Sequence, residues 1–162
     1  MEIKDNFLAP QLFEIISRQM MTSQNFPWYM LDGVSGEGED SYNLMFTHNF
    51  YCDNQTMSSY FNDIILPILF CFREPVRALV RAKGNLYPKT DTLHEHNDHV
   101  DYDFPHKAAI LYLNTNNGFT VIDGERVESV ANRIVYFDPQ TPHHSTTCTD
   151  QLVRANINFN YF

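Results

Sequence analysis

Five short apolar runs in the second half of the chain place the strongest constraint on its fold. From Ala78 onward, segments rich in β-branched and aromatic residues alternate with turn residues, which is typical of short β-strands. In the third run, Asp123-Gly124 lies between alternating apolar positions and predicts a hairpin turn. Several short strands in succession predict a mainly β, two-sheet sandwich or jelly roll. The runs are ALVRAKGNLY (78–87), KAAILYLN (107–114), FTVIDGERVESV (119–130), RIVYFD (133–138) and LVRANINFNYF (152–162).

The N-terminal region has a different pattern. Residues 10–21 (PQLFEIISRQMM) place apolar side chains at helical spacing, with Pro10 in the first turn. A second helical region is expected over about 56–74, where Pro67 kinks the helix or starts a new one. A short strand is predicted in FPWYMLDGV (26–34).

The acidic, glycine-containing stretch 35–43 predicts a loop, and its residues 35–41 are a candidate lid, although a solvated loop is the simpler interpretation. We therefore expect a single domain over residues 1–162. Its mostly helical support region (1–77) braces the core strands of 78–162.

Charge and cysteine usage narrow the class of protein. A formal net charge of −9 argues against a nucleic-acid partner, because phosphates repel such a surface. Three cysteines (Cys52, Cys71 and Cys148) without a metal-binding spacing fit a reducing compartment. The first ten residues lack a signal-peptide pattern, and the longest apolar run (64–72) is too short to span a bilayer. These features predict a cytoplasmic protein that does not enter a membrane.

A cluster of metal-capable side chains lies between the first two predicted core strands. Residues 91–106 (DTLHEHNDHVDYDFPH) contain four of the chain's seven histidines. In HVD, His99 and Asp101 project to the same side of an extended segment, so both can bind one ion. A later histidine, His143 or His144, would complete a two-histidine, one-carboxylate set for iron(II).

The spacing alone leaves alternatives open. A second H-x-D pair is formed by His96 and Asp98, and His94, His96 and Asp101 approximate the metal motif of cupins. On that interpretation the chain is a cupin-like metal-binding protein, either a non-oxidative enzyme or a non-catalytic binder. The remaining possibility is a solvated polar loop without a metal.

Arg154 gives a second, independent indication of a site. It lies on an alternating strand, and a buried arginine is costly unless it meets an anion. Its planar guanidinium suits a carboxylate, so an inward-facing Arg154 near a metal would fit a dicarboxylate co-substrate. An internal salt bridge is the alternative.

Several stretches resemble the iron(II)/2-oxoglutarate-dependent dioxygenases, and in particular the prolyl-4-hydroxylase-like group that includes proteins of marine cyanobacteria and their phages. The resemblance covers most of the chain and implies a double-stranded β-helix, the jelly-roll or cupin-like fold, with supporting N-terminal helices. If the source is a phage, the location implied is the host cytoplasm. The stretches are FPWYML (26–31), RAKGNLYP (81–88), HVDYDFPHKAAILYLNTNNGFTVI (99–122), NRIVYFDPQTPHHSTT (132–147) and VRANINFNY (153–161).

The resemblance also implies roles for individual residues. The metal and catalytic set falls on His99, Asp101 and His143, with His143 preferred to His144 by its distance from the preceding FD. Arg154 matches the arginine that binds the far carboxylate of 2-oxoglutarate. Tyr112 and, more weakly, Asn85 match positions that help to hold the co-substrate. The HEHND stretch before HVD departs from the general pattern.

The implied reaction is hydroxylation of a C–H bond, most simply of free proline or a prolyl residue in a peptide or protein. It is coupled to oxidative decarboxylation of 2-oxoglutarate to succinate and needs iron(II), 2-oxoglutarate and O2, while ascorbate is left open. The substrate-binding residues and the oligomeric state are not predicted.

The remaining candidates have simpler structural interpretations. His144 and His106 fit supporting or surface roles, and His48 fits the edge of a strand. Trp28 and Tyr29 could line a proline-sized pocket, but a lone tryptophan is more often part of a core. Gly118 and Thr120 predict a turn and a strand start.

Overall fold

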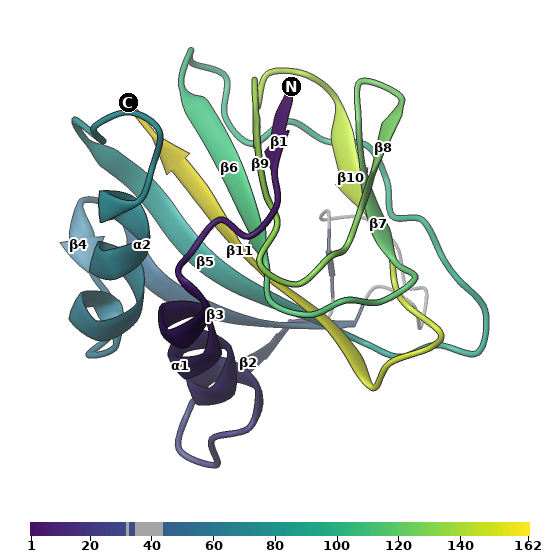
Figure 1. Ribbon diagram of the computed structural model, residues 1–162. Helices are drawn as coiled ribbons and strands as arrows, with labels where there is room; N and C mark the ends of the chain where they lie inside the picture. Colours follow the sequence, from purple (N-terminus) through teal and green to yellow (C-terminus); the bar gives the residue numbers. More distant parts are fainter. Residues whose placement is uncertain (32, 35–43) are drawn as a thin grey trace.

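The structure is a computed structural model that describes residues 1–31, 33–34 and 44–162 (Figure 1). The candidate lid at 35–41 lies outside the described residues. No helix in the described part of the chain has both the length and the apolar character needed to cross a membrane.

Two antiparallel sheets form the body of the molecule. The large, eight-stranded sheet has the order β1-β9-β6-β11-β5-β3-β2, with β4 paired to β3, and the smaller sheet has the order β10-β7-β8. In Figure 1 the smaller sheet lies to the right of β6 and β9. The strands are β1 (Glu2–Lys4), β2 (Tyr29–Leu31), β3 (Met45–Cys52), β4 (Gln55–Thr56), β5 (Leu79–Pro88), β6 (Lys107–Tyr112), β7 (Phe119–Ile122), β8 (Glu125–Glu128), β9 (Ile134–Phe137), β10 (His143–Ser145) and β11 (Val153–Tyr161).

The helices cover the outer face of the large sheet. Helix α1 (Pro10–Met21) has the predicted bounds, with the proline in its first turn. A π-helical turn, η1 (Phe61–Ile65), leads into α2 (Leu66–Phe70), and Pro67 lies in the first turn of α2. This helical region is shorter than the predicted 56–74. In Figure 1, α2 lies at the left beside β4, and α1 lies lower, near β3.

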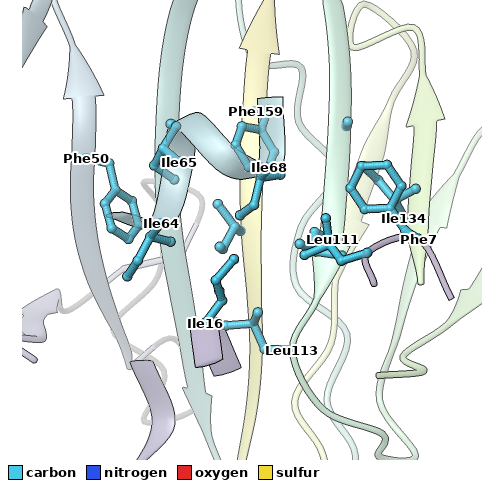
Figure 2. Packing of buried hydrophobic residues seen from close by; sticks show 14 of the residues in the cluster. Phe7, Ile16, Phe50, Ile64, Ile65, Ile68, Leu111, Leu113, Ile134 and Phe159 are labelled. Carbon is cyan, nitrogen blue, oxygen red and sulfur yellow. The ribbon is translucent and has the colours of Figure 1, made fainter. Parts of the chain in front are cut away.

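Strands β5 and β11 have two chemically different faces. On the outer face, the odd-numbered residues of β11, Ala155 through Tyr161, join the main core with the helices. Figure 2 shows Ile68 of α2 beside Phe159 of β11, and Ile16 of α1 next to Leu113. On the inner face, β11 presents Arg154, a residue of the opposite parity, and alternation along the strand sets the two faces apart.

A second, smaller core fills part of the space between the sheets. It contains only apolar and aromatic side chains from β6, β7, β8 and β9, so the interior is apolar on that side and polar along β5 and β11. Its members are Ala108, Ile110, Tyr112, Ile122, Val127, Val135 and Phe137. This arrangement of two sheets confirms the predicted double-stranded β-helix.

Strand β3 is the longest of the strands that were not anticipated from the sequence, and β1, β4 and β10 were not predicted either. Strand β3 pairs with β5 inside the large sheet and departs from the mostly helical character expected for residues 1–77. His48 lies on β3, where it is buried and contacts Pro27 O (2.7 Å) and Ser58 Oγ (2.7 Å). Because β3 has β5 on one side and β2 on the other, His48 is a core residue and not a strand-edge histidine.

Candidate active site

Two distant segments bring His99, Asp101 and His143 together. The backbones of His99 and His143 exchange two hydrogen bonds of 3.0 Å, which ties the segment after β5 to β10. Asp101 follows on the same extended segment. The ligand-capable atoms of the three side chains all lie within 4.8 Å of one another. In the described part of the chain, this is the only group of three or more His, Cys, Asp or Glu side chains that could hold an ion.

Hydrogen bonding and burial set the state of the two imidazoles separately. His143 Nδ1 lies 2.9 Å from Thr141 O and donates to it, which leaves Nε2 as the ring nitrogen that faces the other two side chains. His143 Nε2 is buried and has no hydrogen-bond partner among the described residues. Burial, together with the neighbouring His143, lowers the pKa of His99 and favours its neutral form.

Asp101 is oriented by two side chains from the large sheet. Arg81 Nη2 donates to Oδ1 (2.6 Å) and Asn160 Nδ2 donates to Oδ2 (2.8 Å). Burial would raise the pKa of Asp101, but the Arg81 charge and the Asn160 hydrogen bond outweigh it, so the pKa lies below its ordinary value. The carboxylate is therefore ionised and fixed, with Oδ2 3.8 Å from His143 Nε2.

Arg154 lies at the other end of the inner face and is fully buried. Its Nε donates to Ser129 Oγ (2.8 Å) and its Nη2 to Thr120 Oγ1 (2.8 Å). Its Nη1 has no hydrogen-bond partner among the described residues, and no carboxylate there forms an ion pair with Arg154. The internal salt bridge considered from the sequence is therefore absent from the described part of the chain.

Tyr112 and Gly118 shape the surroundings of the guanidinium. Tyr112 OH donates to Thr120 Oγ1 (2.8 Å), and its ring centroid lies 5.7 Å from Arg154 Cζ. Burial raises the pKa of Tyr112, so its hydroxyl stays protonated. A Cβ on Gly118 would lie 2.6 Å from Arg154 Cδ and 2.5 Å from Thr147 O, which explains why only glycine fits there.

A cavity of about 170 Å³ reaches His99 and Asp101 from the β5 side. Asn85, predicted as a weak co-substrate contact, lines this cavity and donates to Asn156 Oδ1 (3.0 Å). The other lining residues are Val34, Met45, Arg81, Lys83, Tyr87, Val100 and Asn158.

Arg81, Lys83 and Tyr87 were missed from the sequence. Together with the predicted Asn85 they recur at every second position of β5, and this period of two was a usable signal. The same period in β11 relates Arg154 to the three asparagines that follow it. The sequence did not indicate which face of β5 points to the interior.

The other histidines of the cluster lie outside the group of three. His96 Nδ1 contacts Ser145 O (2.8 Å), and His94 Nε2 contacts Thr92 Oγ1 (2.9 Å). His144 contacts carboxylates on both sides, with Nδ1 2.6 Å from Asp98 Oδ1.

His106 and Trp28 also have structural contacts. His106 Nε2 lies 3.0 Å from Asn160 Nδ2, which places His106 behind the Asp101 carboxylate. Trp28 packs against the main core, and its Nε1 donates to Met20 O (3.0 Å). Tyr29 is exposed on β2. The cavity at His99 and Asp101 is not lined by either aromatic residue.

Comparison with known proteins gives the fold a chemical context. No family model matches the chain, and no curated protein matches it. Among solved structures, a prolyl-4-hydroxylase from Pseudomonas putida has a TM-score of 0.63 at 17% identity, covering 99% of this chain and 91% of that chain. A 2OG-Fe(II) oxygenase family protein from Burkholderia pseudomallei has a TM-score of 0.69 at 16% identity, covering 96% and 80%.

A prolyl hydroxylase from Trichoplax adhaerens, in complex with a hypoxia inducible factor peptide fragment, also matches. It has a TM-score of 0.60 at 13% identity, covering 99% of this chain and 82% of that chain. The epimerase SnoN, solved with Fe3+ and α-ketoglutarate, has a TM-score of 0.64 at 12% identity. At these identities the comparisons show that the chain has the fold of 2OG-Fe(II) oxygenases.

Proposed function

We propose that the protein is an iron(II)- and 2-oxoglutarate-dependent oxygenase that hydroxylates a C–H bond. In this proposal His99, Asp101 and His143 hold the iron, and Arg154 binds the far carboxylate of 2-oxoglutarate. Tyr112 and Asn85 take supporting roles in holding the co-substrate. The bound iron would supply oxidative decarboxylation of 2-oxoglutarate to succinate and CO2, coupled to oxygen transfer to the substrate.

The observation that carries this proposal is the state of Arg154. A fully buried guanidinium with no carboxylate partner in the described part of the chain is costly unless a ligand supplies the anion. Ser129 and Thr120 accept hydrogen bonds from Nε and Nη2, and a ligand carboxylate could accept one from the remaining nitrogen, Nη1. The proposed co-substrate has two carboxylates and thus fits both Arg154 and a metal site.

The donor set fits iron(II). Two imidazoles and one ionised carboxylate, arranged around one point, are the ligands that non-haem iron oxygenases use. The buried Nε2 of His143 has no protein partner in the described residues, as expected for an atom reserved for a metal. Arg81 and Asn160 fix Asp101 from behind, which supports ligand orientation.

The apolar side of the interior contributes by limiting water. Val135, Phe137 and Ile110 belong to the small core that faces the polar strands, and the Phe137 ring centroid lies 5.0 Å from that of His143. A low local dielectric strengthens the interactions of Arg154 and Asp101 with bound ligands. These apolar side chains also keep bulk solvent away from the reacting atoms.

For the substrate, we propose free proline or a prolyl residue. The support is the match to two prolyl hydroxylase structures, one of them with a bound peptide. The same fold also occurs in the epimerase SnoN and the DMSP lyase DddQ from Ruegeria pomeroyi. The fold alone therefore does not identify the reaction, and the substrate is to be tested directly.

The test is an assay of succinate formation with iron(II) and 2-oxoglutarate. Candidate substrates are proline, proline-containing peptides and other amino acids, with mass spectrometry for the gain of one oxygen atom. We expect His99→Ala and Asp101→Ala to abolish turnover, because each removes a metal ligand. His143→Ala should do the same.

Neighbouring histidines give matched controls. His94→Ala and His144→Ala change the same type of side chain close by and should keep most of the turnover. If His94→Ala were as damaging as His99→Ala, the ligand assignment would be wrong. That result would favour the cupin-like alternative based on His94 and His96, which nothing in the described part of the chain favours at present.

A further inference from the structure

The inner faces of β5 and β11 form a continuous polar ladder. The strands are antiparallel, and four inward-facing residues of one strand lie opposite four of the other. Ala82 of β5 and the outward-facing residues of β11 pack into the main core, so strand alternation directs the polar residues to the interior. The cross-strand pairs are Tyr87 and Arg154, Asn85 and Asn156, Lys83 and Asn158, and Arg81 and Asn160.

Each cation of this ladder except one has a defined role in the proposed chemistry. Arg81 holds Asp101, and Arg154 faces the proposed co-substrate. Lys83 lines the cavity at His99 and Asp101, but no carboxylate of the described residues forms an ion pair with it. Burial, reinforced by Arg81, lowers the pKa of Lys83 to about 8.

The charges of the site leave room for a further anion. Arg81, Lys83 and Arg154 contribute three positive charges, and Asp101 contributes one negative charge. The two charges of iron(II) and the two of 2-oxoglutarate cancel each other. The loaded site thus keeps an excess of positive charge, and a buried excess of this kind favours an anionic ligand.

Neighbouring acceptors suggest what else that ligand carries. Asn158, opposite Lys83, and Asn85 each have a buried Oδ1 without a hydrogen-bond partner among the described residues. Buried acceptors of this kind call for a donor. A free amino acid has both groups, a carboxylate for Lys83 and an ammonium for an asparagine oxygen.

We propose that Lys83 binds the carboxylate of the substrate, so that the substrate is a small free acid, such as a free amino acid, and not an internal residue of a peptide. This inference rests on the proposed function and narrows it. Lys83 would orient the substrate by its charged end in the cavity next to His99 and Asp101, which leaves a C–H bond of its side chain for reaction.

The experiment compares carboxylates with their amides. Wild type, Lys83→Met and Lys89→Met are loaded with iron(II) and 2-oxoglutarate and assayed for succinate formation with L-proline and L-prolinamide, and then with other amino acids and their amides. Lys89 is an exposed lysine just beyond β5 and serves as the matched control. In parallel, each acid and amide is titrated without oxygen, with Mn(II) replacing iron, to measure the dissociation constant of the probe and that of 2-oxoglutarate.

We expect at least one free acid to bind wild type about tenfold to a hundredfold more tightly than its amide, because a hydrogen bond to a charged group is lost in the amide. Lys83→Met should abolish this preference while leaving the dissociation constant of 2-oxoglutarate within about threefold. Lys89→Met should keep the preference.

Three results would overturn the inference, and they are distinguishable. If wild type binds no 2-oxoglutarate, the proposed function fails and the inference fails with it. If wild type binds 2-oxoglutarate but no free acid better than its amide, only the inference fails. If Lys83→Met weakens 2-oxoglutarate tenfold or more and leaves the preference for the acid intact, Lys83 belongs to the co-substrate.

Discussion

At the scale of single residues, the site is marked by cations placed where they cost stability. Arg154 is fully buried with only hydroxyl partners for two of its nitrogens, and Lys83 is largely removed from water without a carboxylate partner in the described residues. Such groups persist when a ligand compensates them, since an uncompensated buried charge opposes folding. Each can therefore be tested for both binding and stability.

The first prediction concerns Arg154→Met. The change keeps an unbranched side chain but removes the charge, so we expect the dissociation constant of 2-oxoglutarate to rise at least a hundredfold, equivalent to about 3–5 kcal/mol for a buried charged contact. The measurement is an oxygen-free titration with Mn(II) present. Arg126→Met, on exposed β8, is the control and should bind normally. Equal affinity in both variants would remove Arg154 from the co-substrate site.

The second prediction concerns the stability of Lys83→Met. The folded-state pKa of Lys83, about 8, lies below its ordinary value of 10.5, so the unfolded chain binds more protons between these values. Through this group, the free energy of unfolding of the wild type therefore rises with pH between about 8 and 10.5. At pH 7 Lys83 is protonated in both the folded and the unfolded state, so the cost of burying its charge opposes folding to the full extent. We expect Lys83→Met to be more stable at pH 7 by about 1–3 kcal/mol.

The measurement is urea unfolding of both proteins at pH 7 and near pH 10. The advantage of Lys83→Met should shrink at the higher pH, where wild-type Lys83 is neutral in the folded state. A variant that is less stable than wild type at pH 7 would show that Lys83 is compensated by a group in the protein.

At the scale of elements, the turn that precedes β7 holds Arg154 in place. Gly118 lies against Arg154 and Thr147, whereas Gly124, in the β7–β8 hairpin, has nothing within 4 Å of a would-be Cβ. Asp123 and Gly124 have φ values of 53° and 75°, which fits the predicted hairpin turn. The two glycines are thus retained for different reasons, close approach and backbone conformation.

The third prediction contrasts Gly118→Ala with Gly124→Ala. The first introduces a clash with backbone and with Arg154, and we expect it to destabilise the fold by about 1–3 kcal/mol and to weaken 2-oxoglutarate binding. The second costs about 1 kcal/mol through its positive φ and should leave binding unchanged. Thermal unfolding and 2-oxoglutarate titration separate the two effects. Normal 2-oxoglutarate binding by Gly118→Ala would mean that this turn does not position Arg154.

Some elements could be predicted from sequence and others could not, for identifiable reasons. Strand β11 alternates clearly because one of its faces is apolar and the other polar, and α1 has a regular apolar stripe. Both faces of β3 are buried at some positions, so its alternation of apolar and polar residues is less regular. For this reason the strand was not anticipated from the sequence. Helix α2 ends at Phe70, and the N–H groups of Cys71 and Phe72 close its last turn by bonding to the carbonyls of Ile68 and Leu69.

The candidate site shows the same division. HVD and Arg154 were identified because short metal motifs and a strand arginine are local signals. Arg81 and Lys83 were not, because their relevance depends on β5 lying next to β11 with one particular face inward. Pairing between residues far apart in sequence carries that information, and a single sequence does not contain it.

At the scale of the whole molecule, the large sheet separates stability from chemistry. Its outer face packs with α1, η1 and α2 into the main core, and its inner face carries the polar ladder. The smaller sheet closes the interior from the other side and supplies His143. The candidate metal site therefore links the segment after β5, which contributes His99 and Asp101, to β10 of the smaller sheet, which contributes His143.

This arrangement leads to the fourth prediction. Binding of metal and 2-oxoglutarate between the two sheets should raise the free energy of unfolding of the whole domain. With Mn(II) and 2-oxoglutarate each at about 100 times its dissociation constant, each ligand contributes about 2.7 kcal/mol by binding the folded state alone, and the two together contribute about 5.4 kcal/mol. For a chain of 162 residues this corresponds to a rise in Tm of about 10–20 °C, measured by differential scanning calorimetry.

The variants identify the source of that rise. His99→Ala should lose most of it, because the segment after β5 no longer shares an ion with β10. His144→Ala should retain it, since the His144 ring contacts Asp98 and Glu95 and lies outside the group of three. 2-Oxoglutarate without metal should give a smaller shift, which Arg154→Met removes. A full shift in His99→Ala would mean that the metal binds elsewhere, and the link between the two sheets through His99 and His143 would then rest on the backbone hydrogen bonds alone.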